Sequence, residues 1–335
     1  MLNNAIINLV NLKHNAKKIK NKLSSSKLCA VVKADAYGHG ASHVANALYN
    51  ITDSFAVALV EEGIELRQSG INKDILVLIP PFNGEIERAV SYGLTLTVEN
   101  SRQVALIENA CKRCNKKCKV HIKFNSGMNR LGVDSLQQLE KLLDYCSNLR
   151  WVEIEGLFSH YACPQDNCAF ERATEQFLLA NDLVKGYNKN IICHASASGG
   201  FLKGAYFDMV RIGIMLYGYL PFESDFNLKP VMKVYSPVVK EREIEKGQNF
   251  LYGNQVAESS FSASLIRYGY ADGLNRAPVF GQANNRCMDL TMVKDAKAKF
   301  YPVMTNALKL AKEYGTIPYE ILTKVGIRAN KIYIN

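Results

Sequence analysis

Short apolar runs rich in β-branched residues recur through the first two thirds of the chain, with amphipathic segments between them. Helical apolar spacing follows three of these runs, in residues 41–49, 100–110 and 136–146. This alternation favours a parallel sheet with crossover helices. Eight runs are predicted to be its strands: 29–33, 55–59, 75–79, 94–98, 119–124, 155–160, 191–194 and 207–211.

Eight strand and helix units in about 200 residues predict a TIM (β/α)8 barrel, although an open doubly wound sheet fits the same pattern. The pattern of apolar and polar residues changes after Pro221. From there, predicted strands joined by polar or glycine-containing turns follow one another without a long helix between them. We therefore expect a barrel over residues 1–225, with the first few residues able to pair with the second domain, and a smaller, mostly β domain over 226–335. Its predicted elements are strands at 231–240, 248–257 and 262–270 and a closing helix at 302–314.

The composition changes this picture little. Of 335 residues, 48% are hydrophobic and 21% charged, which suits a large buried core and argues against disorder. No run approaches the roughly 18 apolar residues of a membrane span, and the N-terminus lacks a signal-like pattern, so we expect a cytoplasmic protein without a membrane partner. The net charge of +10 is spread along the chain without a recognition motif, and we expect no nucleic-acid partner.

The nine cysteines are an odd number in a chain without a secretion signal, which favours reduced thiols over a disulfide framework. Cys111, Cys114 and Cys118 have the spacing of metal ligands. A fourth Cys or His is missing nearby, and the surrounding residues are cationic or amide, so we expect no metal there.

Lys33 is the first candidate for chemistry. It ends the first predicted strand directly after Ala30-Val31-Val32. Apolar surroundings lower the pKa of a lysine and favour a nucleophilic amine that can form a Schiff base. The alternative is a lysine whose stem lies on the strand end while its charge reaches solvent.

Further polar and small residues follow other predicted strands, at the end of the barrel that carries catalytic loops. Arg211 ends the eighth strand and could reach a ring nitrogen or a carboxylate. The loops after the seventh and eighth strands often bind phosphate in barrel enzymes. Candidates at these ends are His160, His194, Ser196, Ser198, Gly213 and Ile214.

Several segments resemble one family. Residues 30–40, AVVKADAYGHG, resemble the pyridoxal phosphate attachment segment of the alanine racemases, and residues 123–132, KFNSGMNRLG, resemble their arginine loop. The match runs nearly the whole length of the chain and is far more specific than an isolated short motif. Further matching segments are, in order, 156–162, 194–198, 210–218, 251–253, 269–273, 287–289 and 318–320.

The resemblance implies a fold type III enzyme that depends on pyridoxal 5'-phosphate. Lys33 would hold the cofactor as an aldimine and act as acid/base on the D side of the substrate. Tyr252 would act on the L side, at the partner subunit's cofactor, so a homodimer is implied. The small-molecule substrate would be L- or D-alanine, and the D-alanine would be supplied to peptidoglycan of the cell wall.

The resemblance also assigns supporting roles. Arg130 would bond the phenolate oxygen of the cofactor and help to hold the substrate, whose carboxylate would meet the backbone N–H of Met288. Arg211 would face the pyridine nitrogen. His160 and His194 would position these groups, Tyr270 would narrow the pocket, and Lys123, which family members can carry carbamylated, would brace the arginine. Phosphate contacts are implied for Tyr37, Ser198, Gly213, Ile214 and Tyr319.

Two bases are needed for a physical reason. A planar carbanion that is to be inverted needs a proton donor on one face and an acceptor on the other, because one base tends to return the proton to the same face. A guanidinium keeps its proton, so Arg211 would leave the ring nitrogen unprotonated and weaken the electron sink. Such restraint is expected to suppress decarboxylation and transamination.

Some positions depart from the family pattern. Asn125 stands where an acidic residue is expected, and the segments 273–286 and 290–317 are short, where longer β segments are expected.

A broader racemase acting on serine, lysine or arginine is the nearest alternative. Three tyrosines, Tyr252, Tyr270 and Tyr319, suggest a narrow pocket that favours alanine, with serine next. A barrel-type pyridoxal phosphate decarboxylase and a non-catalytic cofactor binder fit less well, because Arg211 disfavours the first and Tyr252 the second.

Overall fold

The computed structural model describes the whole chain except residues 1, 254, 275–285, 295 and 297. The chain divides into two compact units. One comprises residues 12–36 and 41–229, and the other comprises residues 1–11, 37–40 and 230–335. The short segment 37–40, directly after the Lys33 region, therefore belongs to the same unit as the C-terminal third.

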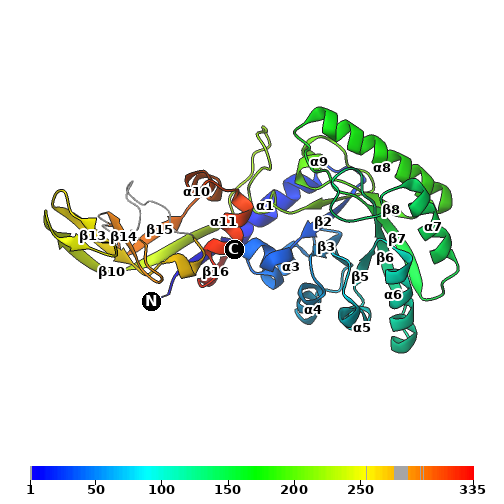
Figure 1. Cartoon of the computed structure of the whole chain (residues 1–335), viewed down its shortest axis with the longest axis horizontal. Coiled ribbons are helices and arrows are strands. Elements are labelled where there is room, and N and C mark those ends of the chain that lie inside the picture. Colours follow the sequence, from blue (N-terminus) through cyan, green and yellow to red (C-terminus); the bar gives the residue numbers. More distant parts are fainter. Residues whose placement is uncertain (1, 254, 275–285, 295, 297) are drawn as a thin grey trace. The chain divides into compact units, whose positions relative to one another are not determined.

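The first unit is a parallel barrel with the strand order β8-β7-β6-β5-β4-β3-β2-β9 (Figure 1). Two backbone hydrogen bonds link the edges, from the Asp208 N–H to the Cys193 carbonyl (3.1 Å) and from the Arg211 N–H to the Ser196 carbonyl (3.0 Å). The barrel prediction is confirmed, and the open doubly wound sheet is wrong. The strands are β2 (Lys27–Val31), β3 (Ser54–Val57), β4 (Ile75–Val77), β5 (Thr95–Val98), β6 (Cys118–Lys123), β7 (Val152–Phe158), β8 (Ile192–His194) and β9 (Met209–Ile212).

Helices surround the barrel and pack against it through apolar faces, and three of them begin at a side-chain cap. The side chains of Asn100, Ser135 and Asp166 each accept a backbone N–H in the first turn of α6, α7 and α8. In α6, Val104, Ile107 and Cys111 are buried, at the spacing that the sequence predicts. The helices are α1 (Leu9–Lys20), α3 (Ala41–Leu48), α4 (Val60–Gln68), α5 (Ile86–Ser91), α6 (Ser101–Cys114), α7 (Leu136–Ser147), α8 (Asn167–Tyr187) and α9 (Ser198–Leu202), with the 3-10 turn η1 (Asn83–Glu85).

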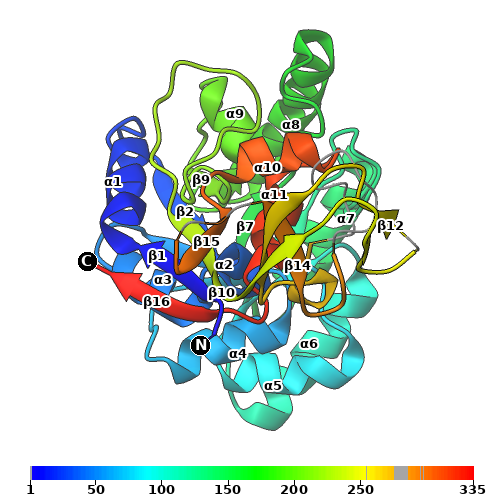
Figure 2. The ribbon, with the colours of Figure 1, turned by 90° about the vertical axis from the view of Figure 1, so that its left-hand side faces the viewer.

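The second unit is built on a six-stranded sheet with the order β14-β13-β10-β1-β16, where β15 also pairs with β10. The N-terminal strand β1 pairs antiparallel with β10 and parallel with β16, so both chain ends share one sheet (Figure 2). Its Ala5 and Ile7 are fully buried. The strands are β1 (Asn4–Asn8), β10 (Met232–Ile244), β13 (Phe261–Ile266), β14 (Thr291–Lys294), β15 (Phe300–Met304) and β16 (Asn330–Ile334).

Two predicted elements of this unit are wrong. The expected strand 248–257 is a small hairpin of β11 (Asn249–Phe250) and β12 (Gln255–Val256), paired antiparallel. The expected helix 302–314 is strand β15 followed by α10 (Ala307–Glu313). Pro302 lies in β15 opposite Tyr235, and the side chain of Asn306 caps the helix by accepting the backbone N–H groups of Leu308 and Lys309.

Other boundaries shift for local reasons. The expected strand 262–270 ends at Ile266, and the 3-10 turn η2 (Tyr270–Asp272) follows it. Phe207, expected to begin the eighth barrel strand, has a φ of 49°, and the strand begins at Met209. Helix α11 (Pro318–Val325) and β16 lie beyond the elements that the hydrophobic pattern predicts. Most of the short segment 273–286 lies outside the described residues.

Candidate active site

Lys33 lies two residues beyond the end of β2 and begins a left-handed turn, α2 (Lys33–Gly38). The four residues from Ala34 to Tyr37 have φ values of 51–54°, a conformation that costs an L-residue about 1–2 kcal/mol. Tertiary hydrogen bonds hold the turn. The Ala34 N–H donates to Oε1 of Glu62 (2.6 Å), and Oδ1 of Asp35 accepts the Ala41 N–H (2.7 Å). Backbone strain of this kind concentrates at functional sites.

The turn continues into a segment that packs tightly within the second unit. Gly38 has a φ of 78°, and a Cβ there would lie 2.4 Å from the Leu322 carbonyl oxygen in α11, so only glycine fits. The rings of Tyr37 and Tyr319 lie 6.1 Å apart. Burial raises the pKa of Tyr319 to about 12 and also raises that of Tyr37. Both phenols therefore stay neutral hydrogen-bond donors, as contacts to a phosphate require.

Four cationic side chains of the barrel unit influence one another: Lys33, Lys123, Arg130 and Arg211. Burial and then Arg130 lower the pKa of Lys33, as the apolar strand before it predicts. Burial, followed by Arg211 and Arg130, lowers the pKa of Lys123 to about 7. The cluster thus provides amines that lose protons unusually easily, in surroundings that attract anions.

The carboxylates near this cluster are already engaged with backbone donors. Oε2 of Glu62 accepts the N–H groups of Ala58 (2.7 Å) and Leu59 (3.1 Å), in addition to the contact of Oε1 with the turn. Oε2 of Glu99 accepts the Gly132 N–H at 2.7 Å. These carboxylates mainly fix loops, so the excess of positive charge remains available to a ligand.

Arg211 is 3% exposed and held rigidly. Its Nη1 donates to Nδ1 and, at 3.0 Å, to the carbonyl of His194; its Nη2 donates to the carbonyls of Ser159 (2.6 Å) and Ala195 (3.1 Å). Within the described part of the chain no acceptor faces its Nε–H, so one N–H is left for a ligand. Burial lowers the pKa of Arg211 only to about 10, and the group stays cationic near neutrality.

The remaining predicted residues of the barrel unit lie on the expected loops. His160 follows β7, and burial followed by the charge of Arg211 lowers its pKa to about 3, so its imidazole is neutral. Ser198 is buried and begins α9, while Gly213 and Ile214 directly follow β9. Asn125, found where an acid is expected, bonds to Asn129 (2.9 Å) and Asp134 (2.8 Å) within its own loop.

Three further predicted residues of the second unit, unlike Tyr37 and Tyr319, are on its surface. Tyr252 lies in the turn between β11 and β12 and is 64% exposed; Met288 is 55% exposed and Tyr270 is 39% exposed. The loops of the latter two are joined, because the Tyr270 N–H donates to the Cys287 carbonyl at 3.1 Å.

Sequence reasoning missed His121, Glu155 and Phe158. His121 hydrogen-bonds His194 at 2.8 Å, and Phe158 stacks on His194 with Nζ of Lys123 4.3 Å from its ring centre. Strand alternation could have found His121, because residues 121 and 123 share one face of β6.

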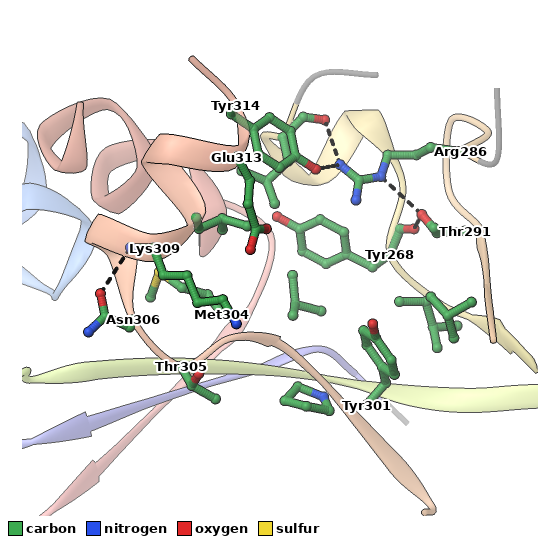
Figure 3. A pocket seen from close by; sticks show the side chains of 16 residues that line it. Tyr268, Arg286, Thr291, Tyr301, Met304, Thr305, Asn306, Lys309, Glu313 and Tyr314 are labelled. Carbon is green, nitrogen blue, oxygen red and sulfur yellow. Dashed lines mark hydrogen bonds between the residues drawn. The ribbon is translucent and has the colours of Figure 1, made fainter. Parts of the chain in front are cut away.

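A separate pocket of about 660 Å³ lies in the second unit and contains none of the predicted site residues (Figure 3). Arg286 reaches into it and donates to the Thr291 hydroxyl (3.1 Å) and the Tyr314 hydroxyl (2.7 Å). Within the described residues no group of three or more His, Cys, Asp or Glu side chains could hold a metal, and no helix could span a membrane.

Comparisons with known proteins match both units to one family. Residues 7–221 match the family model of the alanine racemase N-terminal domain, and residues 231–333 match that of the C-terminal domain. An alanine racemase from Treponema denticola is 34% identical over 377 aligned positions, which cover 99% of this chain and 98% of the relative. A solved structure of alanine racemase from Clostridium difficile 630 has a TM-score of 0.92 and 30% identity, covering 100% of this chain and 96% of that one. The chain belongs to the alanine racemase family.

Proposed function

We propose that this protein interconverts L-alanine and D-alanine with pyridoxal 5'-phosphate, using Lys33 and Tyr252 as opposed bases. The observation that carries the proposal is the Lys33 amine, which begins the strained turn and whose pKa is lowered by burial and by the charge of Arg130. Family membership supports the same activity. The proposal includes that the enzyme works in the cytoplasm and that its D-alanine is supplied to the cell wall.

The residues present fit the cofactor. Lys33 would bind its aldehyde carbon, and the neutral phenols of Tyr37 and Tyr319, with Ser198 and the backbone of Gly213 and Ile214, would hold its phosphate. When bound, pyridoxal phosphate delocalises the electron pair left by the departing α-proton. The positive charges of Arg130 and Arg211 suit the negative charges that the phosphate, the phenolate and the substrate carboxylate would bring.

Arg211 would meet the pyridine nitrogen with its Nε–H. The four contacts of its terminal nitrogens fix the guanidinium plane, and the cation cannot pass its proton to the ring at neutral pH. This weak stabilisation of negative charge favours return of the proton over loss of carbon dioxide. The decarboxylase alternative is disfavoured for this reason.

Lys33 and Tyr252 would each remove or return a proton on one face of the substrate α-carbon. The exposure of Tyr252 and Met288 supports a homodimer in which each subunit lends both residues to the other. The Met288 N–H has no acceptor within the described residues and could bind the substrate carboxylate. Tyr252, Tyr270 and Tyr319 would restrict the side-chain space, which favours alanine over larger amino acids, with serine as the next candidate.

The direct test is incubation of the purified protein and pyridoxal phosphate with each L-amino acid in deuterated water. We expect D-alanine carrying deuterium at the α-carbon, formed faster than any other D-isomer. Faster conversion of serine, lysine or arginine would indicate the broader racemase. Release of carbon dioxide without any D-alanine would contradict the proposal.

Lys123 gives a prediction about pH. Its pKa is about 7 in the folded chain and near the ordinary 10.4 when unfolded, so between these values the unfolded chain binds more protons. In carbon-dioxide-free buffer, the unfolding free energy of the cofactor-free protein should therefore rise from pH 7 to pH 9 relative to Lys123→Met, by at most about 1.4 kcal/mol per pH unit. Urea unfolding at several pH values measures this difference.

Bicarbonate provides the control for this prediction. A neutral lysine amine can take up carbon dioxide, and the resulting carbamate would be an anion beside Arg130 and Arg211. We expect bicarbonate to raise the unfolding free energy of the wild type, because the carbamate forms on the folded chain, and to leave Lys123→Met unchanged. Parallel pH curves of the two proteins, with no rise in bicarbonate, would show that Lys123 titrates normally and is not modified.

A further inference from the structure

A chain of hydrogen bonds runs from Arg211 through the interior of the barrel unit to solvent. Arg211 contacts Nδ1 of His194, and Nε2 of His194 lies 2.8 Å from Nδ1 of His121. Nε2 of His121 lies 3.2 Å from Oε2 of Glu155. Lys119, with a 43% exposed side chain, ends the chain with its Nζ 2.6 Å from Oε1 of Glu155.

The groups at the two ends, Arg211 and Glu155, decide which atom donates and which accepts in each of these hydrogen bonds. A guanidinium can only donate, so Nδ1 of His194 must accept and, in a neutral ring, Nε2 must carry the proton. Nδ1 of His121 then accepts in turn, and its Nε2–H donates to the carboxylate of Glu155. Burial and then the charge of Arg211 hold the pKa of His194 well below its usual range, which keeps that ring neutral.

Glu155 is held as an anion. Burial alone would raise its pKa, but hydrogen bonds from His121 and Lys119 outweigh burial and lower the pKa to about 2. Asp74 also attracts Lys119, with Oδ1 3.4 Å from Nζ. The carboxylate is therefore an acceptor at every pH at which the protein would work.

The local backbone is built for this contact. The register of β6 and β7 shifts, so that Val120 faces Ile154 and His121 faces Gly156, which leaves Glu155 as the extra residue of a bulge. Bulges re-aim side chains in this way. A Cβ on residue 156 would lie 2.5 Å from the His121 ring, so only a glycine at this position leaves room for the imidazole.

We propose that Glu155, acting through His121, is a positioning residue that fixes both imidazole tautomers and thereby the Arg211 guanidinium. The functional part of this inference rests on the proposed racemase activity. In Glu155→Gln, one oxygen acceptor faces two donors, His121 and Lys119. His121 would then be free to carry its proton on Nδ1, which would put the Nδ1 proton of His194 against the N–H of Arg211.

Nitrogen-15 NMR of the histidine rings tests the tautomers directly in the holoenzyme. Bare and protonated ring nitrogens differ widely in chemical shift, and single variants of the other four histidines, His14, His39, His43 and His160, leave the signals of His121 and His194 identified. We expect the neutral Nε2–H form for both rings. A proton on Nδ1 of either ring, or a doubly protonated ring, would overturn the proposal. This test needs no substitution of His121, His194 or Glu155.

Glu155→Gln should mix the tautomers and slow alanine racemisation about 10- to 100-fold, the usual effect of losing a partner that orients a functional group. Asp74→Asn, which removes only the outermost, 59% exposed carboxylate, should change neither. Unchanged tautomers and an unchanged rate in Glu155→Gln would refute the positioning role. A wild type that does not racemise alanine would refute the proposed function. Its histidine spectrum would still show whether the two imidazoles have the tautomers proposed here.

Discussion

Lys33→Ala is expected to abolish alanine racemisation and the absorbance near about 420 nm of a lysine-bound pyridoxal phosphate. Two losses coincide in this variant, because the amine both anchors the cofactor and serves as the base on one face. Burial and the Arg130 charge lower the pKa of this amine, which keeps a larger share of it unprotonated than in a free lysine. The measurements are the absorbance spectrum after removal of free cofactor and the rate of D-alanine formation.

The matched control is Lys22→Ala, which removes an exposed lysine before β2 and should leave both readouts unchanged. Lys123 is the alternative attachment site to test, because its pKa is lowered to about 7 and a large share of its amine is unprotonated near neutral pH. If the band persists in Lys33→Ala and disappears in Lys123→Ala, the cofactor is anchored to the other lysine. The left-handed turn would then need a different explanation.

Tyr252→Phe is expected to lower racemisation about 10²- to 10⁴-fold, the range that a general acid or base contributes. The loss should be specific to one face of the substrate. Exchange of the α-proton of D-alanine with deuterated water should continue through Lys33, while exchange of the α-proton of L-alanine should cease. Tyr145→Phe, on the barrel helix α7, is the matched control and should exchange both isomers at the wild-type rate. Equal loss of exchange from both isomers in Tyr252→Phe would contradict the two-base assignment.

Mixing variants tests whether Tyr252 acts in the partner subunit. A mixed dimer of Lys33→Ala and Tyr252→Phe subunits would contain one site with both bases and one with neither. Random pairing of equal amounts makes half of the dimers mixed, so about a quarter of the wild-type activity should return. No return of activity on mixing would mean that each chain supplies its own tyrosine or that the protein is not a dimer.

Much of the barrel could be predicted from the sequence. Strands buried on both faces appear as short apolar runs, and their regular alternation with amphipathic segments is sufficient to distinguish eight units. The attachment segment around Lys33 and the position of Arg211 at a strand end could also be predicted from the sequence, because catalytic groups in barrels follow strand ends. The direction of the Lys33 pKa shift followed from the apolar residues before it.

The second unit was harder because its signals are local and short. Pro302 and the cap residue Asn306 decide that β15 ends and α10 begins, against a pattern that fits one longer helix. Tyr252 lies in a turn between two strands of two residues each, too short for any alternation to be read. Which strand lies beside β1 is a long-range choice, made by packing of Ala5 and Ile7 into the sheet core.

The sequence by itself determined the eight strand and helix units, the reactive lysine and the family motifs, because these depend on residue type and on periodicity along one segment. Only the tertiary structure decided the left-handed turn after Lys33, which contains no glycine between Ala34 and Tyr37 and depends on Glu62 from a different helix. It also decided the path from Arg211 to Glu155, because one extra residue in β7 turns a side chain that strict alternation would place elsewhere. Contacts between segments distant in sequence leave no period in the chain, and they set the geometry in which Lys33 would act.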